Sequence, residues 1–237
     1  DNRVYNPYAE TPLHDIKIQI SKTTEIYSSP LIELLIHVLS KVHPWIRINR
    51  VARDILKLYI SGGSDREDLR QILEKEMHNR GLKCMDIRAR EVKGQKTDIK
   101  KAELVVREYE SSGGQELFIS FESPDRSIIY GFLRLRLSHE SGAQVFPELQ
   151  NVALMRELHV YGSTVSVSKK KESVLNTAQH IGFGKRLIAA AEKIALERGF
   201  PKMAVIAGVG VRPYYRKLGY EDDPGLGHFQ IKTLVDN

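Results

Sequence analysis

Polar and apolar residues alternate along four runs in the second half of the chain, a pattern typical of strands that bury one face. The runs are Ala102–Tyr109, Glu116–Glu122, Ile128–Leu137 and Val152–Tyr161. Polar segments at Ser111–Gly114 and Ser123–Ser127 supply turns between the first three. Because strands joined by short turns pair with their neighbours, we expect an antiparallel meander.

Helical periodicity replaces this alternation after residue 181. Gly182–Arg198 predicts an amphipathic helix that ends at Gly199 and Pro201. The later elements are expected to be a short buried strand, a short helix and a last strand, at Lys202–Ala207, Arg212–Leu218 and Phe229–Val235. Together with the meander they predict a mixed α/β (α+β) domain over residues 95–237.

The first 94 residues carry fewer elements. Asp15–Ile20 and Trp45–Arg53 alternate and predict strands. Helices are predicted from Pro30 to Val42 and from the capping box Ser64–Glu67 to Arg80, with Gly81 as the glycine that ends the second. Such a set is a piece of an α/β domain. We therefore expect residues 1–94 to be the end of a larger domain, with the basic segment 85–98 as a linker.

Composition narrows the possible classes of function. The chain has 237 residues, a net charge of +6 and one cysteine, Cys84. The charge favours nucleic acid or a phosphate-rich cofactor as a partner, although a mildly basic enzyme without a polyanion has the same composition. A single cysteine excludes an internal disulfide and fits a cytoplasmic location. The first 15 residues are polar and no apolar run approaches the ~20 residues of a membrane helix, so neither a signal peptide nor a membrane span is expected.

Two glycines at the start of the predicted helix 182–198 indicate a phosphate site. Gly182 and Gly184 let a diphosphate approach the backbone, and the first-turn N–H groups with the helix dipole attract its charge. Lys185 or Arg186 would add a counter-charge. The spacing alone is weak evidence: Leu187 stands where a dinucleotide fingerprint has its third glycine, and no Gly-Lys-Ser/Thr of a Walker loop follows.

The same segment resembles the Gcn5-related N-acetyltransferases. Gln179, Gly182 and Gly184 match the Arg/Gln-x-x-Gly-x-Gly/Ala form of their diphosphate loop, and residues 215–220 match their Tyr-x-Lys-x-Gly-aromatic signature. The resemblance implies acetyl-CoA as the cofactor. It implies acetyl-CoA contacts at Glu157, Leu158, His159, Val160, Gln179, Gly182, Phe183, Gly184, Lys185, Tyr214 and Tyr215.

Three of these residues are candidates for the chemistry. Tyr215 stands at the family's tyrosine position and would protonate the departing CoA thiolate, while the strand of Leu158 and Val160 would polarise the thioester carbonyl through its N–H groups. Glu157 and His159 share the opposite face of that strand, and either is a candidate general base. The structural alternatives are a hydrogen bond for Glu157 or His159 and core packing for the tyrosine.

Longer stretches resemble the catalytic subunits of Elongator, a family of tRNA wobble-uridine modifying enzymes that joins a radical S-adenosylmethionine domain to an acetyltransferase domain. The stretches are Arg156–Ser163, Gln179–Gly184, Gly208–Gly210 with Tyr214–Lys217, Gly131–Arg136, Arg50–Ile55 and Lys83–Val92. The resemblance implies tRNA uridine 34 as the substrate, acetyl-CoA as the source of a two-carbon unit, and a radical from S-adenosylmethionine that attaches it at C5. Residues 1–94 would be the end of the radical domain's barrel.

The cysteines of the family's [4Fe–4S] cluster are missing from this sequence. With Cys84 alone the chain cannot bind that cluster, so S-adenosylmethionine chemistry is not expected of it. The sequence is either a piece of a longer protein or a natural short form. Four ligands for the family's structural zinc are not evident either, and no metal site is predicted.

Basic residues of the first unit acquire a function under this resemblance. They are expected to line a groove for the tRNA backbone, and they are Arg47, Arg50, Arg53, Arg88, Arg90 and Lys93. The alternative is a solvated or internally paired surface.

Three functions are to be compared. The first is an acetyl-CoA-dependent acyltransferase that acts in the carboxymethylation of tRNA uridine 34 and hydrolyses acetyl-CoA in a tRNA-linked way. The second is a protein (histone) lysine acetyltransferase, and the third is a non-catalytic tRNA-binding scaffold. The arginine-rich first unit favours the first function, with other Elongator subunits or a second copy of the chain as further partners.

Overall fold

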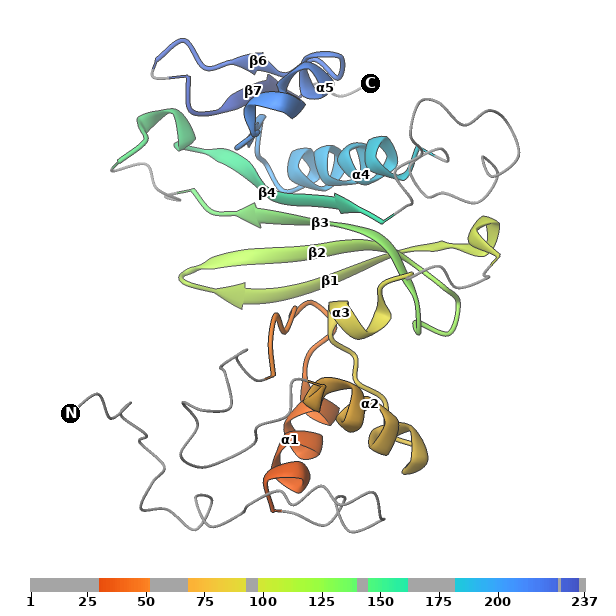
Figure 1. The fold of residues 1–237 in the computed structure, drawn as a ribbon. Coiled ribbons are helices and arrows are strands. Elements are labelled where there is room, and N and C mark those ends of the chain that lie inside the picture. Colours follow the sequence, from red (N-terminus) through yellow and green to blue (C-terminus); the bar gives the residue numbers. More distant parts are fainter. Residues whose placement is uncertain are drawn as a thin grey trace, which may run out of the picture. The chain divides into compact units, whose positions relative to one another are not determined.

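The computed structural model describes residues 30–51, 68–92, 98–139, 145–161, 182–225 and 227–234 (Figure 1). The chain divides into two compact units, residues 1–90 and 91–237, and each has a hydrophobic core of its own. Within the described ranges, no helix has the length and apolar composition that a bilayer crossing requires.

The first unit is built from helices α1 (Pro30–Lys41), α2 (Leu69–Asn79) and α3 (Ile87–Arg90). α1 buries Ile32, Ile36 and Leu39, whose spacing places them on one helical face, against α2. Gly81 follows α2 with a φ of +69°, the left-handed conformation expected of a glycine after a helix end. Both long helices confirm the sequence prediction.

The predicted strand Trp45–Arg53 is wrong over its described part, because residues 45–51 form no strand. Side chains satisfy this backbone in place of a neighbouring strand. Ile48 donates its N–H to Asp86 Oδ2 (3.1 Å) and accepts from Arg70 Nη1 at its carbonyl oxygen (3.1 Å). Arg70 Nη2 in turn binds Asp86 Oδ1 at 2.7 Å. The predicted strand Asp15–Ile20 and the capping box Ser64–Glu67 lie outside the described residues.

The second unit contains one seven-stranded sheet of order β1-β2-β3-β4-β5-β7-β6. The strands are β1 (Glu103–Ser111), β2 (Gly114–Glu122), β3 (Ile129–Leu137), β4 (Val152–Val160), β5 (Lys202–Val205), β6 (Glu221–Asp222) and β7 (Gln230–Thr233). Neighbours pair antiparallel except for β4 and β5, which are parallel. The predicted meander of the first three strands is confirmed as β1 to β3, and β4 extends it antiparallel. The two-residue β6 was too short to predict.

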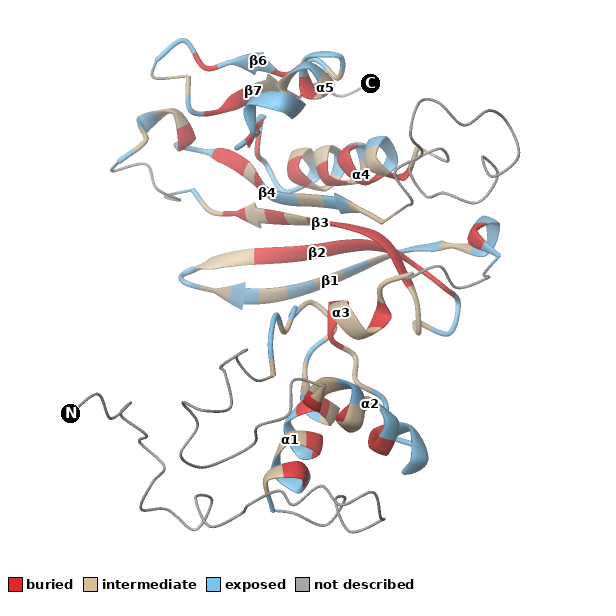
Figure 2. Ribbon diagram, in the orientation of Figure 1, coloured by how far each residue is buried: buried red, intermediate tan, exposed pale blue. Residues whose placement is uncertain are grey.

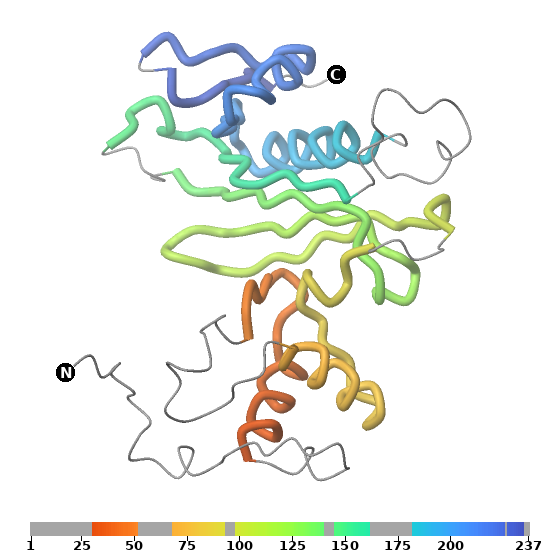
Figure 3. Tube along the Cα trace, in the orientation of Figure 1, coloured from red at the N-terminus to blue at the C-terminus, as the bar shows by residue number. Residues whose placement is uncertain are grey.

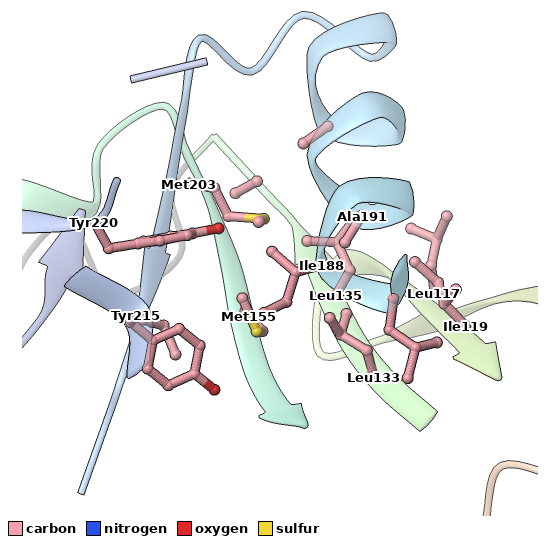
Figure 4. Packing of buried hydrophobic residues seen from close by; sticks show 14 of the residues in the cluster. Leu117, Ile119, Leu133, Leu135, Met155, Ile188, Ala191, Met203, Tyr215 and Tyr220 are labelled. Carbon is pink, nitrogen blue, oxygen red and sulfur yellow. The ribbon is translucent and has the colours of Figure 1, made fainter. Parts of the chain in front are cut away.

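Helix α4 (Phe183–Glu197) connects the parallel pair and packs on one face of the sheet (Figure 3). Leu133, Leu135 and Met155 lie on that face and meet Ile188 and Ala191 of the helix (Figure 4). Strands β2 and β3 are buried along most of their length (Figure 2). Short helices complete the unit: α5 (Arg212–Arg216) and the 3₁₀ turns Ile99–Lys101, Pro147–Leu149 and Val209–Val211.

This arrangement confirms the mixed α/β fold expected of an acetyltransferase domain of the Gcn5-related type. The predicted linker 85–98 is wrong in one part, because Ile87–Arg90 is helical and Asp86 and Ile87 are both fully buried. A basic composition indicated a solvated linker, but Arg88 and Arg90 donate hydrogen bonds to carbonyl oxygens of the first unit.

Candidate functional site at the divergence of β4 and β5

Strands β4 and β5 pair over only part of their length. The parallel ladder joins Val152–Met155 to Lys202–Val205, and β4 then continues alone to Val160. A register shift between Arg134 and Leu135 of β3 leaves Arg156 of β4 without a partner in that ladder, as in a β-bulge. A bulge increases local twist, which accounts for the divergence of the two strands directly after it.

Backbone N–H groups of β4 face this divergence. Tyr161 donates its N–H to the carbonyl oxygen of Tyr130 on the β3 side, at 2.9 Å. Because backbone groups alternate in direction along a strand, the N–H groups of Leu158 and Val160 point away from β3, toward the side on which β5 has ended. Two N–H groups placed in this way are suited to polarising a carbonyl group.

The start of α4 lies next to these donors. Gly182 is the N-cap residue with a left-handed φ of +74°, and it has no side chain with which to cap the helix. A Cβ atom added at Gly184 would stand 2.9 Å from Tyr214 Oη and 3.7 Å from Val160 Cγ2. Any larger residue would therefore displace the Tyr214 hydroxyl, so the two glycines keep this corner of the fold open.

The other residues of the first turn have separate roles. Phe183 is buried and stacks on Phe121 with a centroid distance of 4.2 Å, so its side chain anchors the helix while its backbone lines the turn. The Arg186 guanidinium lies 4.4 Å from the centroid of the same Phe121 ring. Lys185 is exposed and is the side chain of this turn available as a counter-charge. Gln179 lies outside the described residues.

Tyr215 belongs to the core beneath this corner. Its side chain is 6% exposed and packs edge-on against Tyr214. It also packs edge-on against Tyr220 (Figure 4). Burial, with the neighbouring Tyr214, raises the pKa of Tyr215 to about 12, so the phenol keeps its proton at neutral pH. Burial also raises the pKa of Tyr214.

Glu157 and His159 lie on the face of β4 opposite α4, as predicted, while Leu158 and Val160 pack against the core beneath that helix. Glu157 Oε2 accepts a hydrogen bond from Arg134 Nε at 2.8 Å. The His159 ring lies 5.9 Å from the Phe132 centroid. The structure thus brings Val160, Gly184 and Tyr214 together and holds both candidate bases in contacts on the other side of the sheet.

The basic residues of the first unit separate into two groups. Arg47 donates to Asn49 Oδ1 at 2.5 Å, and Arg88 donates to the Asn49 carbonyl oxygen. Asn49 therefore binds two of the basic side chains, next to the exposed Arg50. Arg90 is 2% exposed and donates to the carbonyl oxygens of Met85 and Pro44. Arg53 and Lys93 lie outside the described residues.

Comparisons with known proteins show which proteins the chain resembles. No family model matches the sequence. Elongator complex protein 3 of Bos taurus is 44% identical over 211 residues, which make up 87% of this chain and 37% of that relative. The protein of the same name in Mus musculus is 45% identical over 211 residues, with equal coverage.

The chain is a homologue of Elongator complex protein 3. Among solved structures, the archaeal Elp3 of Methanocaldococcus infernus with an N-terminal deletion is 35% identical, with a TM-score of 0.69 over 86% of this chain and 48% of that one. The match covers the C-terminal region of the archaeal Elp3. The chain therefore spans less than half the length of these Elongator complex protein 3 relatives.

Two features of this homologue were not anticipated from its sequence. His43 and Trp45 stack with ring centroids 4.5 Å apart and an interplanar angle of 3°. A Cβ atom at Gly131 would approach His159 O to 3.0 Å, so the glycine permits close contact between β3 and the site strand. Two aromatic residues two positions apart on an irregular loop give no periodic signal in the sequence. Gly131 belongs to a stretch that resembles the Elongator subunits, but the sequence did not show why a glycine is needed there.

Proposed function

We propose that this chain is an acetyl-CoA-dependent acyltransferase that acts in the carboxymethylation of tRNA uridine 34 and hydrolyses acetyl-CoA in a tRNA-linked way. The observation that carries the proposal is the convergence of Val160, Gly184 and Tyr214 where β4 and β5 part. The homology to Elongator complex protein 3 supports the same assignment.

Acetyl-CoA brings an acetyl thioester and a diphosphate, and the open corner fits both. The first-turn N–H groups of α4 and Lys185 would hold the diphosphate, since a helix N-terminus attracts anions. The N–H groups of Leu158 and Val160 would receive the thioester carbonyl oxygen. Each of these roles uses a group that the fold already leaves facing the corner.

Tyr215 would act on the leaving thiolate. A phenol with a pKa of about 12 is a weaker acid than a thiol with a pKa of ~8.5. It therefore stabilises the thiolate by donating a hydrogen bond, and the proton itself comes from water. Because Glu157 is paired with Arg134 and His159 stacks on Phe132, we assign both to shaping the strand rather than to proton abstraction.

Residues 1–94 would be the end of the family's radical domain, and their exposed face would meet tRNA. Arg47, Arg50 and Arg88 would contact phosphates, while the His43–Trp45 stack offers an aromatic surface for an unpaired base. Arg90 does not belong to this surface because it is buried. The single cysteine does not fit an iron–sulfur cluster, so no step is assigned to S-adenosylmethionine in this chain.

Calorimetric titration of acetyl-CoA into the chain and into Gly184→Ala tests the proposal. The added methyl group displaces the Tyr214 hydroxyl and should weaken binding about tenfold, or ~1.4 kcal/mol. Gly210→Ala is the matched control, because a Cβ there meets nothing within 4 Å.

Hydrolysis of acetyl-CoA measured with and without tRNA then separates the candidate functions. Turnover that rises with tRNA supports the proposal. Transfer of acetyl groups to histone peptides without any tRNA effect would identify a lysine acetyltransferase, and tRNA binding without acetyl-CoA binding would identify a scaffold.

A further inference from the structure

A hollow of about 420 Å³ lies on the sheet face opposite α4. Its apolar wall comes from the small core cluster beneath that face, and its polar wall from two arginines and a hairpin. The lining residues are Phe146, Leu149, Leu154, Ile206, Phe229, Arg136, Arg156, Ser111 and Ser112. None of these residues belongs to the corner between β4 and the start of α4 that is proposed to bind acetyl-CoA, here called the cofactor corner.

A buried carboxylate fixes the two arginines. Glu116 is fully buried, and its Oε1 accepts from Arg136 Nη1 at 3.0 Å and from Arg156 Nη1 at 2.5 Å. Its Oε2 has no hydrogen-bond partner within the described structure. An unsatisfied buried carboxylate oxygen is costly. Glu116 therefore holds the two arginines in place, although one of its own oxygens stays without a hydrogen bond.

The two arginines differ in what they leave open. Arg136 also donates to the carbonyl oxygens of Ser111 and Ser112, both at 2.8 Å, and its side chain is 14% exposed. Arg156 makes its one hydrogen bond in the described structure through Nη1, and its side chain is 46% exposed. The rest of its guanidinium edge is available for a bidentate interaction with an anion.

Charge on this face selects the ligand. Four arginines, Arg107, Arg134, Arg136 and Arg156, meet three glutamates, Glu116, Glu122 and Glu157. The excess of one positive charge disfavours a lysine ammonium group and favours an anion. The rings of Phe146 and Phe229 beside that charge favour a flat, partly apolar group attached to the anion.

The hollow begins where the two strands part. Arg156 is the bulged residue two positions before Leu158, the first of the two N–H donors. Ile206 follows Val205, the last residue of the parallel ladder. A group bound here reaches the divergence from one face of the sheet, while α4 presents its N-terminus on the other. An acceptor and an acyl donor would then approach the N–H groups of Leu158 and Val160 from opposite faces of the sheet.

We propose that this hollow binds a single nucleotide, with its base against the apolar wall and its phosphate on Arg156, as the acceptor side of the acyltransferase site. This rests on the proposed function for the acceptor role alone. The binding itself is a separate property of the face opposite α4.

The test is a titration of uridine 5′-monophosphate, followed by NMR, into the full chain with saturating coenzyme A. Coenzyme A keeps the nucleotide probe from the cofactor corner. Uridine and inorganic phosphate are titrated in parallel. We expect the monophosphate to bind most tightly, and Arg156→Ala to weaken it about tenfold through loss of a charge-assisted bidentate contact.

Arg198→Ala is the matched control, because Arg198 is similarly exposed (42%) and also pairs with a glutamate, Glu108. Its binding should equal that of the unaltered chain. Arg156→Lys keeps the positive charge but not the bidentate guanidinium group, so its affinity for the nucleotide should lie between those of Arg156→Ala and the unaltered chain. An unchanged affinity for coenzyme A shows that each variant is folded.

Equal binding in Arg156→Ala and the unaltered chain would overturn the proposal, as would phosphate binding as tightly as the nucleotide. If coenzyme A does not bind, that failure counts against the proposed function only. The same titrations are then made without it, and the chemical-shift dispersion of each variant shows that it is folded.

Discussion

Tyr215 shows how the core tunes a single functional group. Its ring is held by Tyr214 and Tyr220, and burial keeps the phenol protonated far above neutral pH. A neutral donor in an apolar setting stabilises a developing anion more strongly than the same donor does in water.

Replacement of Tyr215 by phenylalanine should lower acetyl-CoA turnover by ~10–100-fold, the range of a hydrogen bond to a charged group. The affinity for acetyl-CoA should stay within a factor of ~3, because the hydroxyl acts on the leaving group. Steady-state hydrolysis assays give both quantities.

Tyr220→Phe is the control for this experiment. The Tyr220 hydroxyl donates to Glu192 Oε1 at 2.9 Å, so its loss should cost stability while turnover per folded molecule is kept. An unchanged rate in Tyr215→Phe would remove the tyrosine from the mechanism.

Residue-level motifs drew attention to the corner between β4 and α4 and gave no signal for the opposite face of the sheet. Gly182, Gly184 and Tyr215 stood in register with a known pattern, because backbone approach to a diphosphate needs fixed residue types at fixed spacing. Arg156 and Glu116 gave no such signal, since their meeting depends on a bulge and on pairing between strands far apart in the sequence.

At the scale of elements, alternation identified the strands where a neighbour was available to pair. The runs in the second unit became β1 to β5 and β7, with boundaries shifted by a few residues. The same alternation at 45–51 gave no strand, because Arg70 and Asp86 bind the backbone of Ile48 instead. Sequence periodicity cannot show which partner a backbone will find.

The Asp86 carboxylate stabilises this loop of the first unit. Burial raises its pKa, but hydrogen bonds from Arg70 and from the N–H groups of Ala89 and Ile48 outweigh that effect and hold the pKa below its ordinary value of 3.8. The contribution to stability is therefore present above pH 3.8 and is lost as the pH falls through the folded-state pKa.

Asp86→Ala should lower the free energy of unfolding of the first unit by ~3 kcal/mol, because it removes the buried one of the two carboxylates that pair with Arg70 and leaves only Glu74. Trp45 is the only tryptophan of the chain, so its fluorescence during urea unfolding reports on this unit. Asp125→Asn, in the β2–β3 turn, should leave that transition in place. If Asp86→Ala unfolds at the same urea concentration as the unaltered chain, the role assigned to Asp86 is contradicted.

At the scale of the whole molecule, the basic residues behind the net charge of +6 lie in different surroundings. Arginines of the sheet pair with buried or half-buried glutamates, whereas the loop of Arg47 and Arg50 is exposed. Composition alone pointed to an anionic partner, but only the structure distinguishes arginines in buried ion pairs from arginines with an exposed side chain.

Binding of single-stranded RNA, followed by quenching of Trp45 fluorescence, should weaken with salt. Three phosphate contacts, from Arg47, Arg50 and Arg88, predict a slope of about −2 in log affinity against log salt, or ~20-fold between 50 and 200 mM. Arg50→Ala should reduce the slope by ~0.7, while Lys193→Ala, an exposed residue of α4, should not change it. Binding without quenching would place the RNA elsewhere.

Gly182 opens α4 with no side chain to occupy the amides of the first turn. If coenzyme A supplies that missing acceptor, the ligand becomes the first link of the helix, and its concentration sets how firmly the helix is anchored. Catalytic readiness and local order at this corner then rise and fall with the acetyl-CoA supply of the cell.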